Sequence, residues 1–197
     1  MSRLSQAFSL AAELHASQVR KMTAIPYISH LMAVSGLVME FGGDTDQAIA
    51  ALLHDVVEDA PDAEEATRRA MLIRERFGDR VALIVQGCTD GTPDAHGRKD
   101  NWRTRKEAYL SHLQAASPDI LLVSCADKLH NARAIVSDLR LIGPAVFERF
   151  TAGRDGTLWY YSQLAVIFCS KLQSPLALEL ERMVRDMNGL ASELSPI

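Results

Sequence analysis

The segment from Ala50 to Asp59 carries the residues best suited to chemistry, because His54 and Asp55 stand side by side within it. An imidazole and a carboxylate directly after an apolar stretch are two metal-ligand types presented from one rigid element. Glu58 and Asp59 follow shortly after, so one helical turn would return them to the side of the ligands. This spacing predicts a metal site with two further acids beside it.

Two other positions offer ligands of the same kinds. Asp127 follows the hydrophobic residues 120–123, and His30 lies in an apolar stretch that begins near Pro26. Ionisable residues at the ends of buried helices are costly for folding unless something compensates them, and a bound cation would do so. A lone histidine on an apolar helix face is more often structural than a ligand, so the prediction depends on the joint pattern. Two imidazoles and two carboxylates suit a borderline divalent ion such as Mn²⁺, Fe²⁺, Co²⁺ or Zn²⁺.

The elements that must position these residues are predicted to be helices, because apolar residues recur at helical spacing and glycine and proline separate the stretches. No segment shows convincing β-alternation, and residues 87–101 form the main irregular loop. We predict one all-α domain over residues 1–197, a compact bundle of about eight to ten helices, with residues 174–197 as a C-terminal helical extension. The predicted helices span approximately 4–14, 26–41, 44–56, 61–77, 79–86, 102–113, 118–139, 144–150, 157–172 and 175–187.

Composition narrows the class of protein. The chain has 197 residues, 48% hydrophobic and 23% charged, which is ordinary for a globular protein. Its formal net charge of −4 argues against nucleic-acid binding, which normally leaves a basic footprint. Three scattered cysteines are too few for a disulfide framework or a cysteine-based zinc site. We find no signal peptide and no membrane span, and we expect a cytoplasmic protein without a membrane partner.

Three motifs resemble the HD superfamily of metal-dependent phosphohydrolases. They are residues 18–30, residues 51–59 and residues 126–131, in that order along the chain. More narrowly, they resemble the hydrolase domain of RelA/SpoT proteins and the stand-alone small alarmone hydrolases of the metazoan SpoT homologue type. The resemblance covers about residues 5–170. Ala24, Leu31 and Ala60 depart from the common family pattern, and none of the three removes a ligand or a charged group.

The resemblance implies an HD-type helical fold, a Mn²⁺ site and a pair of catalytic acids. It also implies hydrolysis of guanosine 3′,5′-bis(diphosphate), ppGpp or pppGpp, to GDP or GTP and pyrophosphate. The implied metal ligands are His30, His54, Asp55 and Asp127, and the implied catalytic acids are Glu58 and Asp59.

A substrate with so many phosphate charges needs cations, and basic residues surround the motifs. Arginine suits bidentate phosphate contacts, while lysine acts as a mobile point charge. For the helix around residues 103–106, a solvated face is the simpler interpretation. The family pattern also places a late tyrosine against the substrate, whereas we expect Trp159 and Tyr160 to pack in the core. The predicted substrate-binding residues are Arg20, Lys21, Arg105, Lys106, Lys128, Asn131 and Tyr161.

Two alternatives to ppGpp hydrolysis stay open at this stage. One is a related phosphohydrolase that acts on adenosine alarmones such as ppApp, on NADPH or on a nucleoside monophosphate. The other is a non-catalytic nucleotide sensor that keeps the fold and has lost the chemistry. The expected partner is in each case a phosphorylated purine nucleotide. An oligomer is possible, since the apolar segment 176–190 suits either a packing helix or an interface.

Overall fold

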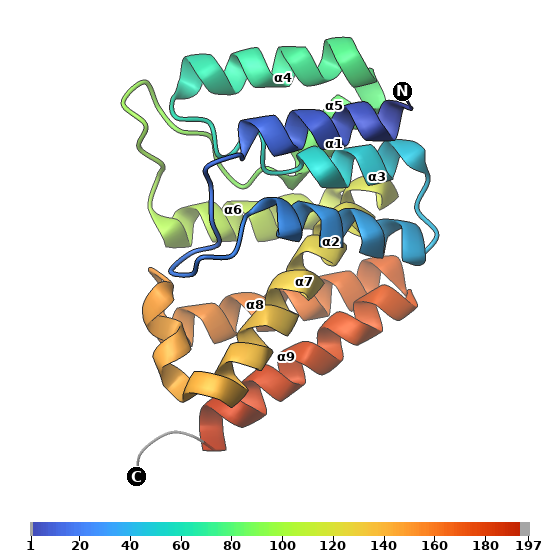
Figure 1. Ribbon diagram of the computed structural model, residues 1–197. Helices are drawn as coiled ribbons and strands as arrows, with labels where there is room; N and C mark the ends of the chain where they lie inside the picture. Colours follow the sequence, from blue (N-terminus) through green and yellow to red (C-terminus); the bar gives the residue numbers. More distant parts are fainter. Residues whose placement is uncertain (1, 194–197) are drawn as a thin grey trace.

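The computed structural model describes residues 2–193, and its regular structure there is helical, which confirms the predicted all-α fold (Figure 1). A single isolated β-bridge, between Val19 and Pro26, is the only β-structure within that range. The helices are α1 (Arg3–Leu14), α2 (Ile28–Glu40), α3 (Thr45–Leu53), α4 (Ala63–Phe77), α5 (Asp79–Cys88), α6 (Trp102–Ala115), α7 (Pro118–Ile142), the 3₁₀ helix η1 (Gly143–Arg149), α8 (Gly153–Leu172) and α9 (Pro175–Glu193).

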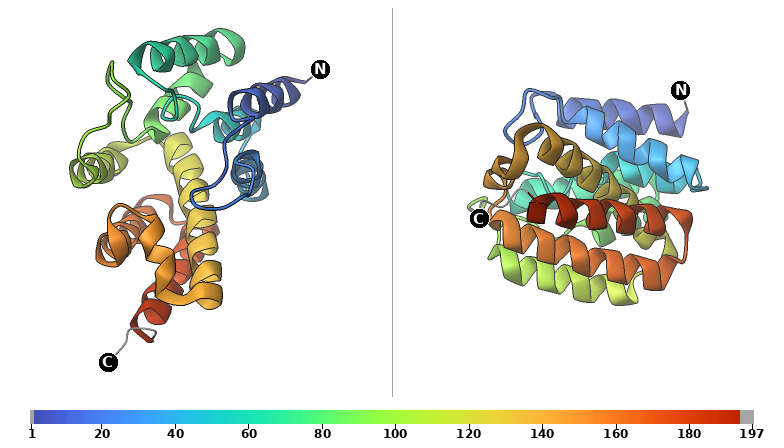
Figure 2. Two further views of the ribbon diagram at one scale, coloured as in Figure 1. Left: turned by 60° about the vertical axis from the view of Figure 1, so that its left-hand side comes forward. Right: turned by 90° about the horizontal axis from the view of Figure 1, so that it is seen from below.

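Helix α7 is the central element of the fold. Its 25 residues pack against α2, α3, α5, α8, α9 and η1. Seen from the side, α7 runs through the middle of the molecule, with α2 on one side and α6 and α8 on the other (Figure 2). Helix α3 is buried from Ala48 to Leu53 without interruption. The start of α2, the end of α3 and the middle of α7 meet inside the protein, which is where predicted metal ligands lie.

Local sequence signals define the helices that carry the site. The α3 start is a capping box, in which the Asp44 side chain accepts from the Gln47 backbone N–H and the Gln47 side chain accepts from the Asp44 N–H. Helix α7 begins with Ser117 as N-cap and Pro118 in its first turn. Gly143 follows its last residue with φ 65°, a conformation that favours glycine.

Several helix boundaries differ from the prediction, and α7, α8 and α9 are longer than expected. Helix α2 begins at Ile28 and not near Pro26, because residues 18–27 form a hairpin-like turn in which the Tyr27 N–H donates to the Gln18 carbonyl at 2.9 Å. Helix α3 ends at Leu53, so residues 54–59 form a series of turns and not a continuing helix. One α-type hydrogen bond, from the Asp59 N–H to the Asp55 carbonyl, survives there at 2.9 Å. The predicted helix near residues 144–150 is the 3₁₀ helix η1.

The C-terminal helix α9 packs against α7 and α8. Its apolar face, which includes Leu176, Leu180, Val184 and Met187, belongs to the same hydrophobic core as α1 and α2. The treatment of 174–197 as an extension stays a prediction, and residues 194–197 lie outside the described range. Within residues 2–193, the helices are all too short or too polar to cross a bilayer.

Candidate metal centre and adjoining cavity

Two buried imidazoles and one buried carboxylate converge at the centre of the molecule. His30 comes from the first turn of α2, His54 caps the C-terminal end of α3, and Asp127 lies in the middle of α7. One ligand atom from each lies within 4.8 Å of the other two. Asp127 Oδ1 is 3.2 Å from His30 Nε2 and 3.6 Å from His54 Nε2. Three helices that are separate in sequence thus bring together a metal-binding donor set.

The hydrogen bonds of His54 leave its inner nitrogen free to bind a metal. His54 Nδ1 lies 2.8 Å from the carbonyl oxygen of Ala51, and because a carbonyl can only accept, Nδ1 carries the proton. The opposite nitrogen, Nε2, is buried and faces the carboxylates of Asp55 and Asp127 at 3.0 and 3.6 Å, without a hydrogen bond of regular geometry within residues 2–193. A buried polar atom without a partner is unfavourable, and a metal ion would satisfy it.

His130 on α7 fixes the orientation of the His30 ring, and Arg20 in turn contacts His130. Its Nδ1 lies 2.8 Å from His130 Nδ1, which also lies 3.4 Å from Nη1 of Arg20. Since a guanidinium can only donate, His130 Nδ1 accepts, and His30 Nδ1 must carry the proton. His30 Nε2 is then free to face the carboxylates. Burial and the charges of His30 and Arg20 lower the pKa of His130 to about 4, which keeps it a neutral acceptor.

Both oxygens of Asp127 are held by neighbours on its own helix. Oδ1 accepts from Asn131 Nδ2 and Oδ2 accepts from Lys128 Nζ, each at 2.6 Å. Burial alone would raise the pKa of Asp127, but the charge of Lys128 and the contacts with His30 and His54 keep it well below its usual value. The carboxylate is therefore ionised and aimed at the imidazoles.

Asp55, the remaining predicted ligand, lies on the open side of this cluster. Its Oδ2 is 3.0 Å from His54 Nε2 and 3.7 Å from His30 Nε2, and it accepts from the Tyr27 hydroxyl at 2.5 Å. Burial opposes a charge on His54, but Asp55 and Asp127 offset it, and the pKa of His54 is raised well above its usual value. Asp55 and Asp127 thus favour a positive charge between them, and this donor set fits a divalent cation.

The two predicted catalytic acids occupy different surroundings. Glu58 Oε1 accepts from Lys99 Nζ at 3.1 Å, and its Oε2 accepts from the backbone N–H of Asp90 at 3.2 Å. Asp59 lies at the solvent edge and accepts from Gln18 Nε2 at 2.8 Å. Partial desolvation and the charges of Asp55 and Glu58 raise the pKa of Asp59. Both carboxylates are thus oriented by residues outside the motif 51–59.

A cavity of about 500 Å³ adjoins the metal centre, since Lys128 and Asn131, which both bind Asp127, form part of its wall. Six predicted substrate-binding residues line it: Arg20, Lys21, Lys106, Lys128, Asn131 and Tyr161. Arg105 does not, because its guanidinium is turned toward Asp90. Five basic side chains, Arg149 included, and a single carboxylate, Asp138, line the cavity. It therefore suits a ligand with several negative charges.

Aromatic side chains form another part of this wall. Trp102, Phe150, Tyr160 and Tyr161 line the cavity, so Tyr160, which was expected only to pack in the core, also faces the ligand space. Its hydroxyl is buried and has no hydrogen-bond partner among the described residues. Flat aromatic surface beside basic residues suits a nucleobase attached to phosphates.

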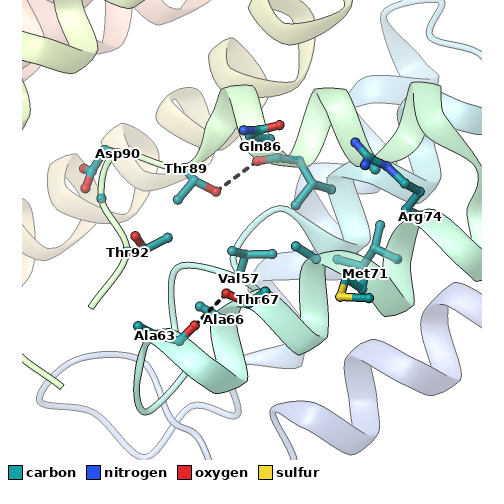
Figure 3. A pocket seen from close by; sticks show the side chains of 15 residues that line it. Val57, Ala63, Ala66, Thr67, Met71, Arg74, Gln86, Thr89, Asp90 and Thr92 are labelled. Atoms are coloured by element: carbon teal, nitrogen blue, oxygen red, sulfur yellow. Dashed lines mark hydrogen bonds between the residues drawn. The ribbon is translucent and has the colours of Figure 1, made fainter. Parts of the chain in front are cut away.

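A larger cavity of about 640 Å³ lies between α4 and α5 (Figure 3). Its walls are mainly small or apolar side chains such as Val57, Ala66, Met71 and Val85, and none of the predicted metal ligands lines it. It offers neither the ligand atoms nor the cluster of cations found at the other cavity. We therefore take the smaller cavity as the candidate site because of the side chains that line it, and not because of its volume.

Sequence reasoning missed residues that support the ligands, although most of them lie within the three motifs. Neither His130 nor His15 was among the predicted site residues. His15 is buried, and its Nδ1 lies 2.5 Å from Oε1 of Gln18, the residue that holds Asp59. The sequence positions of Gln18 and Tyr27 just before His30 are the only signal that could have pointed to these contacts.

Comparison with known proteins adds independent findings. A family model described as HD domain matches residues 7–158. The probable GTP pyrophosphokinase of Mycobacterium leprae is 36% identical over 135 residues, which cover 68% of this chain and 16% of that protein. The guanosine-3′,5′-bis(diphosphate) 3′-pyrophosphohydrolase of Haemophilus influenzae is 35% identical over 134 residues, covering 65% and 18%. The bifunctional (p)ppGpp synthase/hydrolase SpoT of Escherichia coli is 34% identical over 139 residues, covering 70% and 18%.

The chain thus spans less than a fifth of the length of these curated relatives. A solved structure of similar size matches nearly the whole chain. It is described as a metazoan ortholog of SpoT that hydrolyses ppGpp and plays a role in starvation responses. The two chains are 25% identical with a TM-score of 0.73, and the match covers 96% of this chain and 97% of the other.

Proposed function

We propose that this chain, which belongs to the HD domain family, is a metal-dependent 3′-pyrophosphohydrolase that converts ppGpp or pppGpp to GDP or GTP and pyrophosphate. The observation that carries the proposal is the position of the His30, His54 and Asp127 cluster directly beside a cavity lined by five cations. A metal-activated nucleophile and a polyphosphate-binding wall are the two parts that this reaction requires. The names of the relatives and the match to the metazoan SpoT ortholog support the same reaction.

The metal would be held by His30, His54 and Asp127, with Asp55 as a fourth ligand. Mn²⁺ is the ion we propose, since the resemblance implies it and the mixed donor set suits it. When bound, such an ion lowers the pKa of a water molecule and stabilises negative charge on a phosphoryl oxygen.

The protein's own residues then divide the remaining work. Glu58 orients the attacking water and accepts its proton, while Asp59 supports it at the solvent edge. Lys128 lies on the ligand-bearing helix α7, and Arg20 binds Asn131 of that helix; both line the cavity and neutralise the pyrophosphate group as charge develops on it. Tyr160 and Tyr161 pack against the nucleoside. The cavity's cations hold the remaining phosphates, which keeps the 3′ phosphorus beside the metal centre.

The alternatives predict different outcomes in a single experiment. The purified protein is analysed for bound metal and then given ppGpp, ppApp and NADPH in parallel, with release of pyrophosphate or phosphate as the readout. We expect pyrophosphate release from ppGpp to be fastest, to stop with a chelator and to return with Mn²⁺. The His54→Gln variant is the control, and it should neither retain metal nor turn over substrate. Preference for ppApp or NADPH would reject the guanine assignment, and metal-loaded protein that binds ppGpp without turnover would be a sensor.

A further inference from the structure

Asp90 is a buried carboxylate that the reaction described above does not use. It lies two residues after the end of α5, at the start of the loop that leads to α6, and Figure 3 shows it at the rim of the larger cavity. Its side chain is only 4% exposed and pairs with both Arg105 and Lys106 of α6. A buried carboxylate is costly unless it is well paired. Two successive cations of one helix are therefore fixed by one acid from another element.

The backbone of the same residue contacts the proposed catalytic acid. The Asp90 N–H donates to Glu58 Oε2 at 3.2 Å, and Lys99 from the same loop donates to Glu58 Oε1 at 3.1 Å. Both oxygens of Glu58 are thus held by the loop between α5 and α6. Asp90 joins this loop to α6, because its main chain binds Glu58 and its side chain binds Lys106.

Lys106 needs such a partner because of where it lies. It lines the basic cavity together with Lys128, and its Nζ lies 4.9 Å from the centre of the Tyr160 ring. Burial and the charge of Lys128 lower the pKa of Lys106 to about 8. Lys128 has Asp127 as its counter-ion. Asp90 plays the corresponding part for Lys106, and without it the two ammonium groups would repel each other across the cavity wall.

We propose that Asp90 is a positioning residue, which fixes Lys106 at the cavity wall so that its ammonium meets a phosphate group of the substrate. The inference rests on the proposed function, since the phosphate-binding role of Lys106 comes from it. Asp90 itself does not touch the substrate. It acts through Lys106, while its main chain holds Glu58.

The test replaces Asp90 by Asn, which keeps size and the backbone N–H and removes the charge. Asp94→Asn is the matched control, because Asp94 lies in the same loop with an exposed carboxylate that caps the N–H groups of His96 and Arg98. The first readout is calorimetric affinity of the Mn²⁺-loaded protein for inorganic pyrophosphate, which needs no turnover. We expect roughly a 10- to 100-fold loss in Asp90→Asn and no loss in Asp94→Asn. Unchanged affinity in Asp90→Asn overturns the proposal.

The double variant with Lys106→Met shows whether Asp90 acts through Lys106. If it does, Asp90→Asn costs nothing further in the Lys106→Met background, whereas a full additional loss means that it acts independently and overturns the proposal. In steady-state kinetics on ppGpp, the effect should appear mainly in KM. A merely structural loss would lower Tm and the metal-loaded fraction, and would leave the KM of the remaining active protein unchanged.

Two further measurements distinguish a failure of the Asp90 proposal from misfolding and from a failure of the proposed function. If Asp90→Asn does not fold, Asp90→Glu keeps the charge but displaces it by one methylene group, and it should lose pyrophosphate affinity. Wild-type affinity in Asp90→Glu would then overturn the proposal. If the wild type binds pyrophosphate but hydrolyses none of the nucleotides, the proposed function fails, while the affinity measurements still decide the role of Asp90.

Discussion

Replacing Asp55 by Asn tests whether this residue is a metal ligand or only a neighbour of the ligands. His30, His54 and Asp127 form the tight cluster, while Asp55 Oδ2 lies 3.0 Å from His54 Nε2 and 3.7 Å from His30 Nε2. Asn has the same shape but no charge and can still accept from Tyr27. The substitution therefore changes the donor set with little effect on packing.

The expected effect can be worked out from mass action. A metal present at about 100 times its Kd stabilises the folded protein by about 2.7 kcal/mol. For a chain of this length that raises Tm by roughly 5–11 °C. Removing a supporting residue weakens metal binding roughly 10- to 100-fold, and we expect loss of a direct ligand to reach at least the upper value. At the same metal concentration the Asp55→Asn protein would then gain only about 0.4 kcal/mol, or roughly 1–2 °C.

The assay is thermal unfolding of the metal-free protein with and without added Mn²⁺, together with the metal content of each variant after gel filtration. Asp186→Asn serves as control, because the Asp186 carboxylate pairs with Arg140 on the surface at 3.3 Å. Asp186 is not one of the predicted metal ligands. That variant should show the full wild-type rise in Tm. A full rise and wild-type metal content in Asp55→Asn would refute the assignment of Asp55 as a ligand.

Three other predictions concern residues around the ligands. Glu58→Gln should keep metal and substrate binding and lose roughly 10²- to 10⁴-fold in kcat; a rise in KM at unchanged kcat would make Glu58 a binding residue. His130→Phe removes the acceptor of His30 Nδ1, and metal titration should show roughly 10- to 100-fold weaker binding, with wild-type affinity contradicting the orientation argument. Because burial and Lys128 lower the pKa of Lys106 to about 8, its positive charge is lost as pH rises through that value. kcat/KM should therefore fall above about pH 8, and the same profile in Lys106→Met would assign the titration to another group.

The sequence was sufficient to predict which residues meet at the centre but not their local geometry. His54-Asp55 and Asp127 are recognisable because ligand types directly follow apolar helical runs. The helix was nevertheless expected to continue past His54, since Val56 and Val57 extend the apolar pattern. In the structure both valines are buried within turns that take the place of the helix. Their apolar side chains are therefore explained by burial and do not require a helix. Apolar spacing alone cannot distinguish these cases.

The supporting contacts could not be predicted, because they join residues that packing brings together. Arg20 and His130 are 110 positions apart, and Glu58 and Asp90 are 32 apart. No local pattern links the members of either pair. The position of Tyr160 at the cavity could not be predicted either, because this residue packs on the core and also lines the cavity. Which face of a buried aromatic remains accessible depends on the neighbouring helices.

The acidic centre and the basic cavity stabilise each other through Asp127. One oxygen of this carboxylate binds Lys128 and the other binds Asn131, which in turn accepts from Arg20 at 2.9 Å. Lys128, Asn131 and Arg20 therefore already have partners, which reduces the cost of burying their polar groups. A divalent ion would compete with Lys128 and Asn131 for the same carboxylate and so leave their donors more available to phosphate. The arrangement would thus favour binding of phosphate groups where a metal is bound, beside the acids that we propose as catalytic.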